Sequence, residues 1–334
     1  MTSDGDGLRT SDGPLVEVHD AVFLDLDGVV YIGPDALPGV VDTVNRVDLP
    51  VAYLTNNATR AATEIADHLR SFGLRLDDDA VVTAGQVVSD QIAADLGTGA
   101  RVLVAGADGM RRAVEEAGLV AVTSMDDDPE AVVQGGVVDI RWSQLAEASY
   151  AVAAGLPWYA SNPDLTFPTP RGLAPGNGAL VQAVRTATGA EPLVAGKPGR
   201  LIFDTASRRL GAQRPIMVGD RVDTDIDGAI TAGVPSMLVL TGVTDLAHLF
   251  AVEPGHRPDF VSATLAGLNA EHPAVSVTGH SARCRGVTAE ARDGVIEVDG
   301  APRDICSIRA ATALAWSMRD ASDVIARPGG TLEP

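Results

Sequence analysis

Short apolar runs alternate with longer segments of helical spacing between about residues 20 and 240. Runs such as Ala21–Leu26, Val51–Leu54 and Ser236–Leu240 have the length and composition of buried strands. The segments between them repeat apolar residues every three or four positions, as amphipathic helices do. This alternation predicts an α/β fold in which βαβ crossovers connect parallel strands.

The predicted elements follow in chain order. The expected strands are Ala21–Leu26, Val51–Leu54, Val81–Thr83, Arg101–Ala105, Ala131–Gln134, Trp158–Ser161, Ile216–Val218 and Ser236–Leu240. The expected helices are Val40–Val47, Thr59–Phe72, Gln86–Leu96, Met110–Ala117, Ser143–Ala153, Ala179–Thr188, Arg200–Arg209 and Asp225–Ala232. Gly, Asp, Thr and Asn gather where strands lead into helices, which is the edge at which such sheets bind ligands.

The two ends of the chain have different patterns. The polar stretch Met1–Pro14 is predicted to be a frayed leader, and residues 252–273 are interpreted partly as a linker. Beyond them, short strands, a hairpin turn at Asp293-Gly294 and one helix predict a small α+β appendage. Its expected strands are Val275–Val277, Val287–Ala291 and Val295–Val298, its helix is Ile308–Met318, and a tail follows from Pro328.

Charge and composition narrow the class of protein. The formal net charge of −20 repels nucleic acid and anionic lipid, so neither is an expected partner. No apolar run approaches the ~20 residues of a membrane-spanning helix, and the N-terminus lacks a signal-peptide pattern. A cytoplasmic protein is therefore predicted. The two cysteines, Cys284 and Cys306, are expected to be buried thiols of a reducing compartment.

Two carboxylates follow the first apolar strand and are the first candidate for chemistry. Asp25 and Asp27 flank Leu26, and Gly28 permits a tight turn directly afterwards. Burying a charge is costly unless something compensates it, so acidic residues at this place favour a bound cation or a reaction. A solvated strand end followed by an Asp-Gly turn is the structural alternative.

Three more polar segments follow later strands or helices. Thr55-Asn56-Asn57 ends the second strand and supplies hydroxyl and amide groups, although Asn57 or Thr59 could simply cap a helix. Gly196-Lys197-Pro198 contains the single lysine of a chain that otherwise uses arginine, which indicates a place that needs a compact ammonium charge. A last strand runs into Asp220, followed by Asp225.

Together these four segments resemble the haloacid dehalogenase-like (HAD) hydrolase superfamily, in its NagD and p-nitrophenylphosphatase branch. The matching motifs are DLDGV at 25–29, TNN at 55–57, GKP at 196–198 and GDRVDTDI at 219–226. Their order along the chain makes the match far more specific than any one motif. The resemblance covers about residues 20–262.

The resemblance implies a phosphatase mechanism that begins at the first carboxylate. Asp25 is the expected nucleophile, which becomes an aspartyl phosphate. Asp27 is the expected general acid and base. Mg²⁺ is the expected cofactor, held by Asp25, the backbone carbonyl of Asp27 and Asp220. Asp225 is expected to orient water or Lys197.

The resemblance also implies which groups bind the substrate. Thr55, the backbone of Asn56, Asn57 and Lys197 are expected to hold the phosphate. Asn162 is a candidate contact to the leaving group, although ordinary packing explains it equally well. The neighbouring candidates Asp164, Arg141 and Trp142 carry the same alternative.

The fold implied is a Rossmann-like core of parallel strands with an inserted α/β cap. The core is expected at residues 15–82 and 191–262, the cap at 83–190, and a C-terminal α+β module of unknown role at 274–327. Such a cap would exclude bulk water and select the leaving group. A homo-oligomer formed through the cap is left open.

The expected substrate is a small phosphorylated metabolite. With its C-terminal extension, the chain is similar to actinobacterial glycerol-3-phosphate phosphatases, so glycerol 3-phosphate is the first expectation. Phosphoglycolate, pyridoxal phosphate and nucleoside monophosphates are the alternatives. A phosphoryl mutase would also retain both Asp25 and Asp27. A regulator that binds a phosphometabolite without turnover is the alternative of another class, and it would need neither carboxylate.

Overall fold

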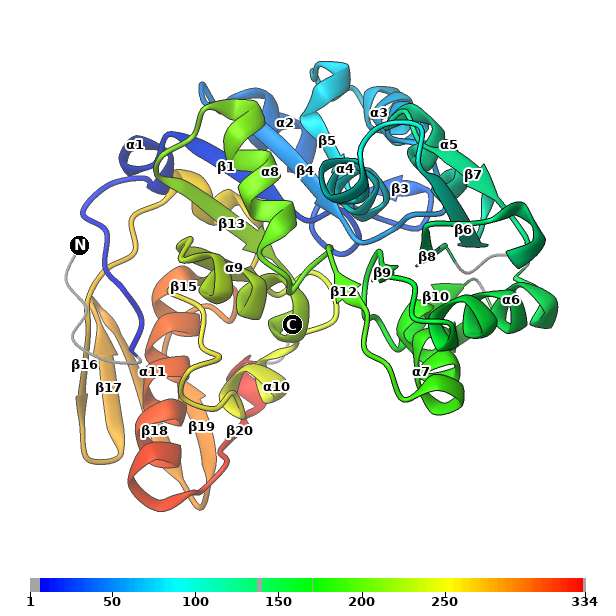
Figure 1. Ribbon diagram of the computed structural model, residues 1–334. Helices are drawn as coiled ribbons and strands as arrows, with labels where there is room; N and C mark the ends of the chain where they lie inside the picture. The colour runs from blue at the N-terminus through cyan, green and yellow to red at the C-terminus, as the bar shows by residue number, and fades with distance from the viewer. Residues whose placement is uncertain (1–6, 137–139, 170, 333–334) are drawn as a thin grey trace. The chain divides into compact units, whose positions relative to one another are not determined.

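The computed structural model describes residues 7–136, 140–169 and 171–332 (Figure 1). The chain forms two compact units, one of Met1–Val51 with Leu210–Pro334 and one of Ala52–Arg209. Both units contain parallel strands alternating with helices, which confirms the predicted α/β class. None of the helices in the described part of the chain combines the length and apolar character needed to cross a membrane.

The first unit is built from a parallel sheet and a smaller antiparallel one. Its strands are β1 (Ala21–Leu24), β2 (Tyr31–Ile32), β3 (Asp35–Ala36), β13 (Pro215–Gly219), β14 (Ser236–Val239), β15 (Phe260–Ser262), β16 (Val275–Thr278), β17 (Ser281–Cys284), β18 (Val287–Arg292), β19 (Val295–Val298) and β20 (Arg327–Pro328). Its helices are α1 (Leu15–Val18), α2 (Val40–Asn45), α9 (Asp227–Ala232), α10 (Leu246–Phe250) and α11 (Ile305–Ser322).

Strands β15, β14, β13 and β1 lie side by side in that order and are all parallel. Every residue of β1, β13, β14 and β15 is buried, as their continuous apolar runs predict for strands covered on both faces. Leu24 pairs with Val218 at the end of the β1–β13 ladder. The residues that follow these two strands therefore emerge at one edge of the sheet.

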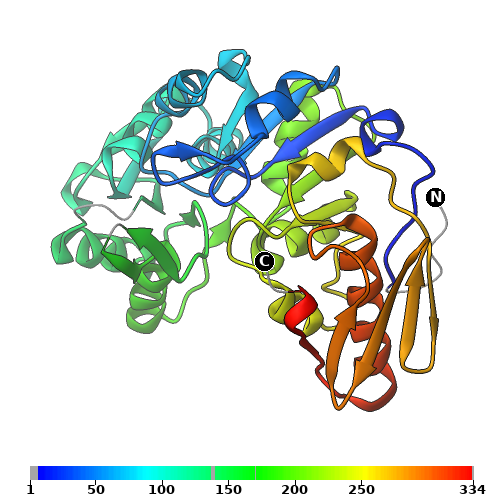
Figure 2. The same cartoon turned by 180° about the vertical axis from the view of Figure 1, so that it is seen from behind.

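The predicted C-terminal appendage is an antiparallel sheet with one long helix (Figure 2). Strands β16 to β19 form three successive antiparallel pairs, and β20 adds in parallel to β19. Side chains of α11, including Ala310 and Leu314, pack with Ala282 and Ile296 of the sheet in one buried cluster. Cys284 and Cys306 are free, buried thiols in this cluster, as expected.

The interpretation of residues 252–273 as partly a linker is wrong for residues 260–262 and for His272. Residues 260–262 form the fully buried strand β15, and His272 is completely buried. The predicted frayed leader is wrong as well, where the structure describes it. Ser11 forms a β-bridge with His272, and Arg9 makes a 2.7 Å ion pair with Asp259. Both segments are ordered because residues near the N-terminus contact residues 259–272, far away in the sequence. Local composition does not indicate such contacts. Residues 1–6 lie outside the described part.

The second unit contains a five-stranded parallel sheet in the order β12-β9-β8-β6-β7. The strands of the whole unit are β5 (Val81–Thr83), β6 (Arg101–Gly106), β7 (Val120–Val122), β8 (Ala131–Gly135), β9 (Trp158–Ala160), β10 (Thr166–Thr169), β11 (Gly172–Pro175) and β12 (Leu193–Val194). Strand β4 (Val51–Thr55) begins at the last residue of the first unit and continues into the second. Its helices are α3 (Ala62–Ser71), α4 (Ala84–Leu96), α5 (Asp108–Glu116), α6 (Trp142–Ala153), α7 (Asn177–Thr188) and α8 (Leu201–Leu210).

Strands β7 and β12 of the second unit were not predicted, and two further local features also differ from the expectations. Helix α3 begins at Ala62, so neither Asn57 nor Thr59 caps it. The Asn57 side chain instead accepts a hydrogen bond from the backbone of Thr59, in a turn that precedes the helix. The antiparallel hairpin β10–β11 was not predicted, because Pro-rich sequence is a poor strand signal.

Candidate active site

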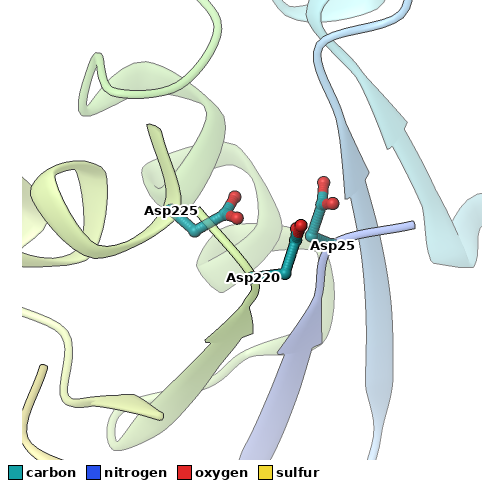
Figure 3. Close-up of side chains that lie close together, drawn as sticks. All are labelled: Asp25, Asp220 and Asp225. Carbon is teal, nitrogen blue, oxygen red and sulfur yellow. The ribbon is translucent and has the colours of Figure 1, made fainter. Parts of the chain in front are cut away.

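Three buried carboxylates come together in the first unit. Asp25, Asp220 and Asp225 each offer an oxygen atom, and these oxygens lie within 4.8 Å of one another. In Figure 3 Asp25 follows the end of β1, Asp220 follows β13, and Asp225 projects from the next turn toward them. Asp220 and Asp225 are fully buried, and Asp25 is 9 % exposed. We call these three residues the acidic triad.

The strand register explains why Asp25 and Asp220 meet. The two strands are parallel neighbours, and the backbone N–H of Asp25 donates a 2.9 Å hydrogen bond to the carbonyl oxygen of Val218. Both aspartates therefore extend from the carboxyl ends of adjacent strands, where ligands of parallel sheets bind. Almost 200 residues of sequence separate them.

Asp225 reaches the triad through a helical turn of unusual width. Residues Val222–Ile226 form a π-helical turn that leads directly into α9. The Asp225 carboxylate accepts a 3.1 Å hydrogen bond from the backbone N–H of Arg221. A side chain on Gly219 would place its Cβ only 2.1 Å from the Cβ of Asp225. The close approach of Asp225 to the strand end therefore requires a glycine at 219.

The segment from Thr241 to Val243, which follows β14, also shapes the triad, although no sequence motif indicated it. The backbone N–H of Val243 donates a 2.6 Å hydrogen bond to the Asp220 carboxylate. The Thr241 hydroxyl donates a 2.6 Å hydrogen bond to the carbonyl of Gly28. A Cβ on Gly242 would lie 1.9 Å from an Asp220 carboxylate oxygen. The Thr-Gly pair directly after an apolar strand was the available signal.

Electrostatics and donor chemistry make the triad suitable for a divalent cation. Two carboxylate charges 4.8 Å apart repel by ~3.5 kcal/mol at an effective dielectric constant of 20. A divalent cation removes this repulsion. Carboxylate and carbonyl oxygens are hard donors, which Mg²⁺ prefers, and a site with few protein ligands leaves room for water and substrate. The residues present therefore fit a magnesium ion.

Asp27 differs from the triad in its surroundings. It is exposed, and it lies in the turn in which the backbone N–H of Gly28 donates to the carbonyl of Tyr31. Gly28 has a φ of +86°, and a Cβ there would lie 2.5 Å from an Asp220 oxygen. The glycine thus serves both the turn and the close approach of Asp220.

The other predicted site residues lie in the second unit, where the structure brings several of them together. Thr55 and Lys197 are buried, and Asn56 and Asn57 are half-buried. The Lys197 ammonium donates a 3.3 Å hydrogen bond to the carbonyl of Leu54, just before Thr55. The Thr55-Asn56-Asn57 and Gly196-Lys197-Pro198 segments are therefore neighbours. The roles implied for these segments also require that they lie beside the acidic triad, which stays a prediction.

Asn162 is buried and belongs to the same neighbourhood. Its side-chain amide donates a 2.6 Å hydrogen bond to the backbone carbonyl of Asn56. The backbone carbonyl of Asn162 accepts a 2.8 Å hydrogen bond from the side-chain amide of Asn177. Trp142, in contrast, is 78 % exposed on α6.

Comparison with known proteins identifies the class. A family model described as haloacid dehalogenase-like hydrolase matches residues 22–120, and one described as HAD-hydrolase-like matches residues 194–268. The matched segments contain the three carboxylates, the Thr55–Asn57 segment and Lys197. The chain belongs to the haloacid dehalogenase-like hydrolase family, and the resemblance seen in its motifs is confirmed.

Individual relatives are phosphatases. The chain is 39 % identical to a D-glycerol 3-phosphate phosphatase of Mycobacterium tuberculosis, over 94 % of this chain and 90 % of the relative. A crystal structure of a glycerol phosphate phosphatase from that organism, in complex with magnesium, superposes with a TM-score of 0.81 at 37 % identity, covering 91 % and 92 % of the two chains. A 4-nitrophenylphosphatase from Thermotoga maritima gives 0.71 at 31 % identity, covering 76 % and 98 %.

Proposed function

We propose that this chain is a Mg²⁺-dependent phosphatase that hydrolyses glycerol 3-phosphate to glycerol and inorganic phosphate. The observation that carries the proposal is the acidic triad at the ends of two adjacent parallel strands, in a chain similar to known phosphatases. The match covers 94 % of the chain, so it must include most of the C-terminal sheet and α11. This extent supports glycerol 3-phosphate over the substrates of relatives that match less of the chain.

The reaction proceeds in two steps, and Asp25 carries the first. An oxygen of its carboxylate attacks phosphorus, and the bond from phosphorus to the glycerol oxygen breaks. The protonated carboxyl of Asp27 gives its proton to that oxygen, so glycerol leaves as a neutral alcohol. The exposure of Asp27 supports this role, because the group must meet both the alcohol and water.

Hydrolysis of the aspartyl phosphate completes the cycle. Asp27, now a carboxylate, takes a proton from water as the water oxygen attacks phosphorus. The bond between phosphorus and Asp25 breaks, which releases inorganic phosphate and restores both carboxyl groups. One water molecule is consumed in each turnover.

The acidic triad provides the electrostatic conditions for both steps. Asp25, the backbone carbonyl of Asp27 and Asp220 would hold Mg²⁺, and Asp225 would orient water or Lys197 beside them. When bound, the ion neutralises negative charge on the phosphoryl group. The hydrogen bonds from Val243 to Asp220 and from Arg221 to Asp225 fix the two carboxylates before substrate arrives.

Residues of the second unit are proposed to hold the phosphoryl oxygens. Thr55 and Asn57 offer polar side chains, Asn56 offers its backbone N–H, and Lys197 adds the ammonium charge. The burial of Lys197 supports this role, because a lysine charge inside the protein needs an anionic partner or strong acceptors. Asn162 is proposed to contact the leaving group.

The domain division also enters as a proposal. Residues 15–82 and 191–262 form the catalytic core, residues 83–190 form the cap, and residues 274–327 form an accessory module.

We place the enzyme in the cytoplasm as a homo-oligomer that associates through the cap. Trp142 and Leu173, 78 % and 76 % exposed, support an apolar contact there. Light scattering of the wild type and of Trp142→Ser tests it, and a monomeric wild type would refute it.

The catalytic proposal is tested with p-nitrophenyl phosphate. The wild type is expected to hydrolyse it with Mg²⁺ and to lose the activity with excess chelator. Asp25→Asn keeps the shape of the side chain but lacks the nucleophile, so its turnover should fall by at least ~10³-fold. Asp223→Asn is the matched control, because Asp223 is an exposed carboxylate that pairs with Arg221 outside the triad. Equal inactivity of wild type and Asp25→Asn would support the regulator instead.

The substrate is tested with a panel of phosphomonoesters at matched concentration. Glycerol 3-phosphate is expected to give the highest kcat/KM, ahead of phosphoglycolate, pyridoxal phosphate and nucleoside monophosphates. A higher kcat/KM for any of these would replace glycerol 3-phosphate as the substrate. Transfer of the phosphoryl group to a second hydroxyl, without release of phosphate, would indicate a mutase.

A further inference from the structure

The side chain of Asn56 lies where three segments of the second unit meet. Asn56 follows β4, and its hydrogen bonds reach the Gly196-Lys197-Pro198 segment and the loop from Ser161 to Asp164. The loop precedes the hairpin β10–β11 and belongs to the proposed cap, whereas Lys197 belongs to the proposed core. One amide group thus connects parts of the chain more than 100 residues apart.

The amide of Asn56 pairs with the backbone of Lys197 on both sides. Its Oδ1 accepts a 2.8 Å hydrogen bond from the Lys197 N–H, and its Nδ2 donates a 2.9 Å hydrogen bond to the Lys197 carbonyl. A pair of this kind fixes the orientation of the lysine backbone, and therefore the direction in which the side chain leaves it. A Cβ on Gly196 would lie 2.6 Å from the Asn56 Oδ1, so the neighbouring glycine is required by this contact.

The same Nδ2 also holds Asp164. It lies 3.1 Å and 3.2 Å from the two oxygens of the Asp164 carboxylate. The backbone carbonyl of Asn56 accepts a further hydrogen bond from Asn162, whose side-chain oxygen accepts from the N–H of Asp164 at 3.2 Å. A Cβ on Gly178 would lie 2.0 Å from the carbonyl oxygen of Pro163, so the loop is closely packed from its other side.

The chemistry of the partners allows only one orientation of the amide. The Asp164 carboxylate and the Lys197 carbonyl accept hydrogen bonds and face the Nδ2 group, while the Lys197 N–H donates and faces Oδ1. Both N–H bonds of the amide are used by these acceptors. The Asn56 side chain therefore has no donor left for a phosphate oxygen unless it releases Lys197 or Asp164.

We propose that Asn56 is a positioning residue that holds Lys197 in its active conformation and couples it to Asp164 and Asn162. The inference rests on the proposed function for the role of Lys197, and it adds a link between cap and phosphate-binding lysine. The backbone N–H of Asn56 keeps its proposed contact to the phosphate. Replacing the side chain misplaces the Lys197 ammonium, and a displacement of about 1 Å is enough to slow a reaction by ~100-fold.

The test uses the fact that Lys197 is the only lysine in the chain. Acetic anhydride labels its amine, and mass spectrometry of the peptide that contains it gives the labelling rate. Asn56→Ala and the isosteric Asn56→Asp remove the donors. In both variants we expect acetic anhydride to label Lys197 several-fold faster than in the wild type. Both should hydrolyse p-nitrophenyl phosphate ~100-fold more slowly, chiefly because kcat falls.

Two further variants separate positioning from a general loss of stability. Gln144→Ala removes another amide with two backbone partners, the N–H of Arg141 and the carbonyl of Gly106, and should leave Lys197 labelling and kcat unchanged. Asp164→Asn keeps an acceptor for Asn56 and should retain most activity, whereas Asp164→Leu should resemble Asn56→Ala. If Asn56→Ala does not fold, Asn56→Asp carries the measurement.

The outcomes decide between two roles. Unchanged Lys197 labelling in Asn56→Asp, with a loss of activity confined to KM, would make the side chain a substrate ligand and overturn the proposal. Faster labelling together with a fall in kcat supports it. Labelling does not need turnover, so a wild type inert toward every phosphate would end the proposed function while the positioning of Lys197 is still measured.

Discussion

Replacement of His272 gives a prediction of stability that follows from the geometry of the first unit. The ring is completely buried and packs edge-on against Phe260, with ring centres 5.0 Å apart. Its Nε2 lies 3.0 Å from the carbonyl of Gly267, and its Nδ1 lies 3.5 Å from Nη1 of Arg309. Nε2 therefore carries the proton and Nδ1 accepts. Protonation of Nδ1 would place a second donor against a buried guanidinium.

Burial, with a smaller contribution from Arg309, lowers the pKa of His272 from 6.5 to about 4. The unfolded chain binds a proton below pH 6.5 and the folded chain does not until about pH 4, so acid favours unfolding in this window. The stability is fully present above pH 6.5 and is lost as the pH falls toward 4. Linkage gives a loss of ~2 kcal/mol at about pH 5 and ~3 kcal/mol at about pH 4.

Urea unfolding at about pH 7.5 and about pH 5 measures this effect. The wild type should lose ~2 kcal/mol more than His272→Gln between the two conditions, because glutamine does not titrate. The comparison uses only the change with pH, so a constant cost of the substitution cancels. His280→Gln, at an exposed position, is the control and should keep the pH dependence of the wild type. An equal loss in wild type and His272→Gln would refute the reasoning.

Three further predictions concern the first unit. Saturating Mg²⁺ should raise the unfolding free energy by ~2.7 kcal/mol at 100 times its Kd, and Asp220→Asn should abolish the gain in calorimetry. Gly242→Ala would force a Cβ to within 1.9 Å of the Asp220 carboxylate. The affinity for Mg²⁺ should therefore fall ~10-fold or more, while the circular dichroism spectrum stays native. An unchanged affinity would contradict the structure. Arg257 makes two hydrogen bonds to Asp320 and covers Trp316, so Arg257→Met should cost ~2 kcal/mol in urea and Asp320→Asn clearly less.

The parallel-strand pattern and the order of the motifs could be predicted from the sequence because both are local signals. Each buried strand is a continuous apolar run, and Asp25 and Asp220 directly follow two such runs. Parallel strands end at a common edge, so the sequence pattern already predicts that the two carboxylates lie there. Asp225 was expected only to orient its neighbours, and its full burial beside the other two carboxylates required the π-helical turn.

Other features came from contacts that no local pattern reports. The local composition around His272 is typical of a linker, yet the residue is completely buried. It forms a β-bridge with Ser11 and its ring contacts Arg309. The segment from Thr241 to Val243 reads as a loop, yet it supplies a backbone donor to Asp220.

The sequence by itself determined the fold class, the family and the residue types of the candidate site, because strand periodicity and motif spacing are written in consecutive positions. The tertiary structure alone decided which polar groups became hydrogen-bond partners, as with Asn56, Lys197 and Asp164. Hydrogen-bond partners at such separations depend on how packed elements bring backbones together, and that information is distributed over the whole core.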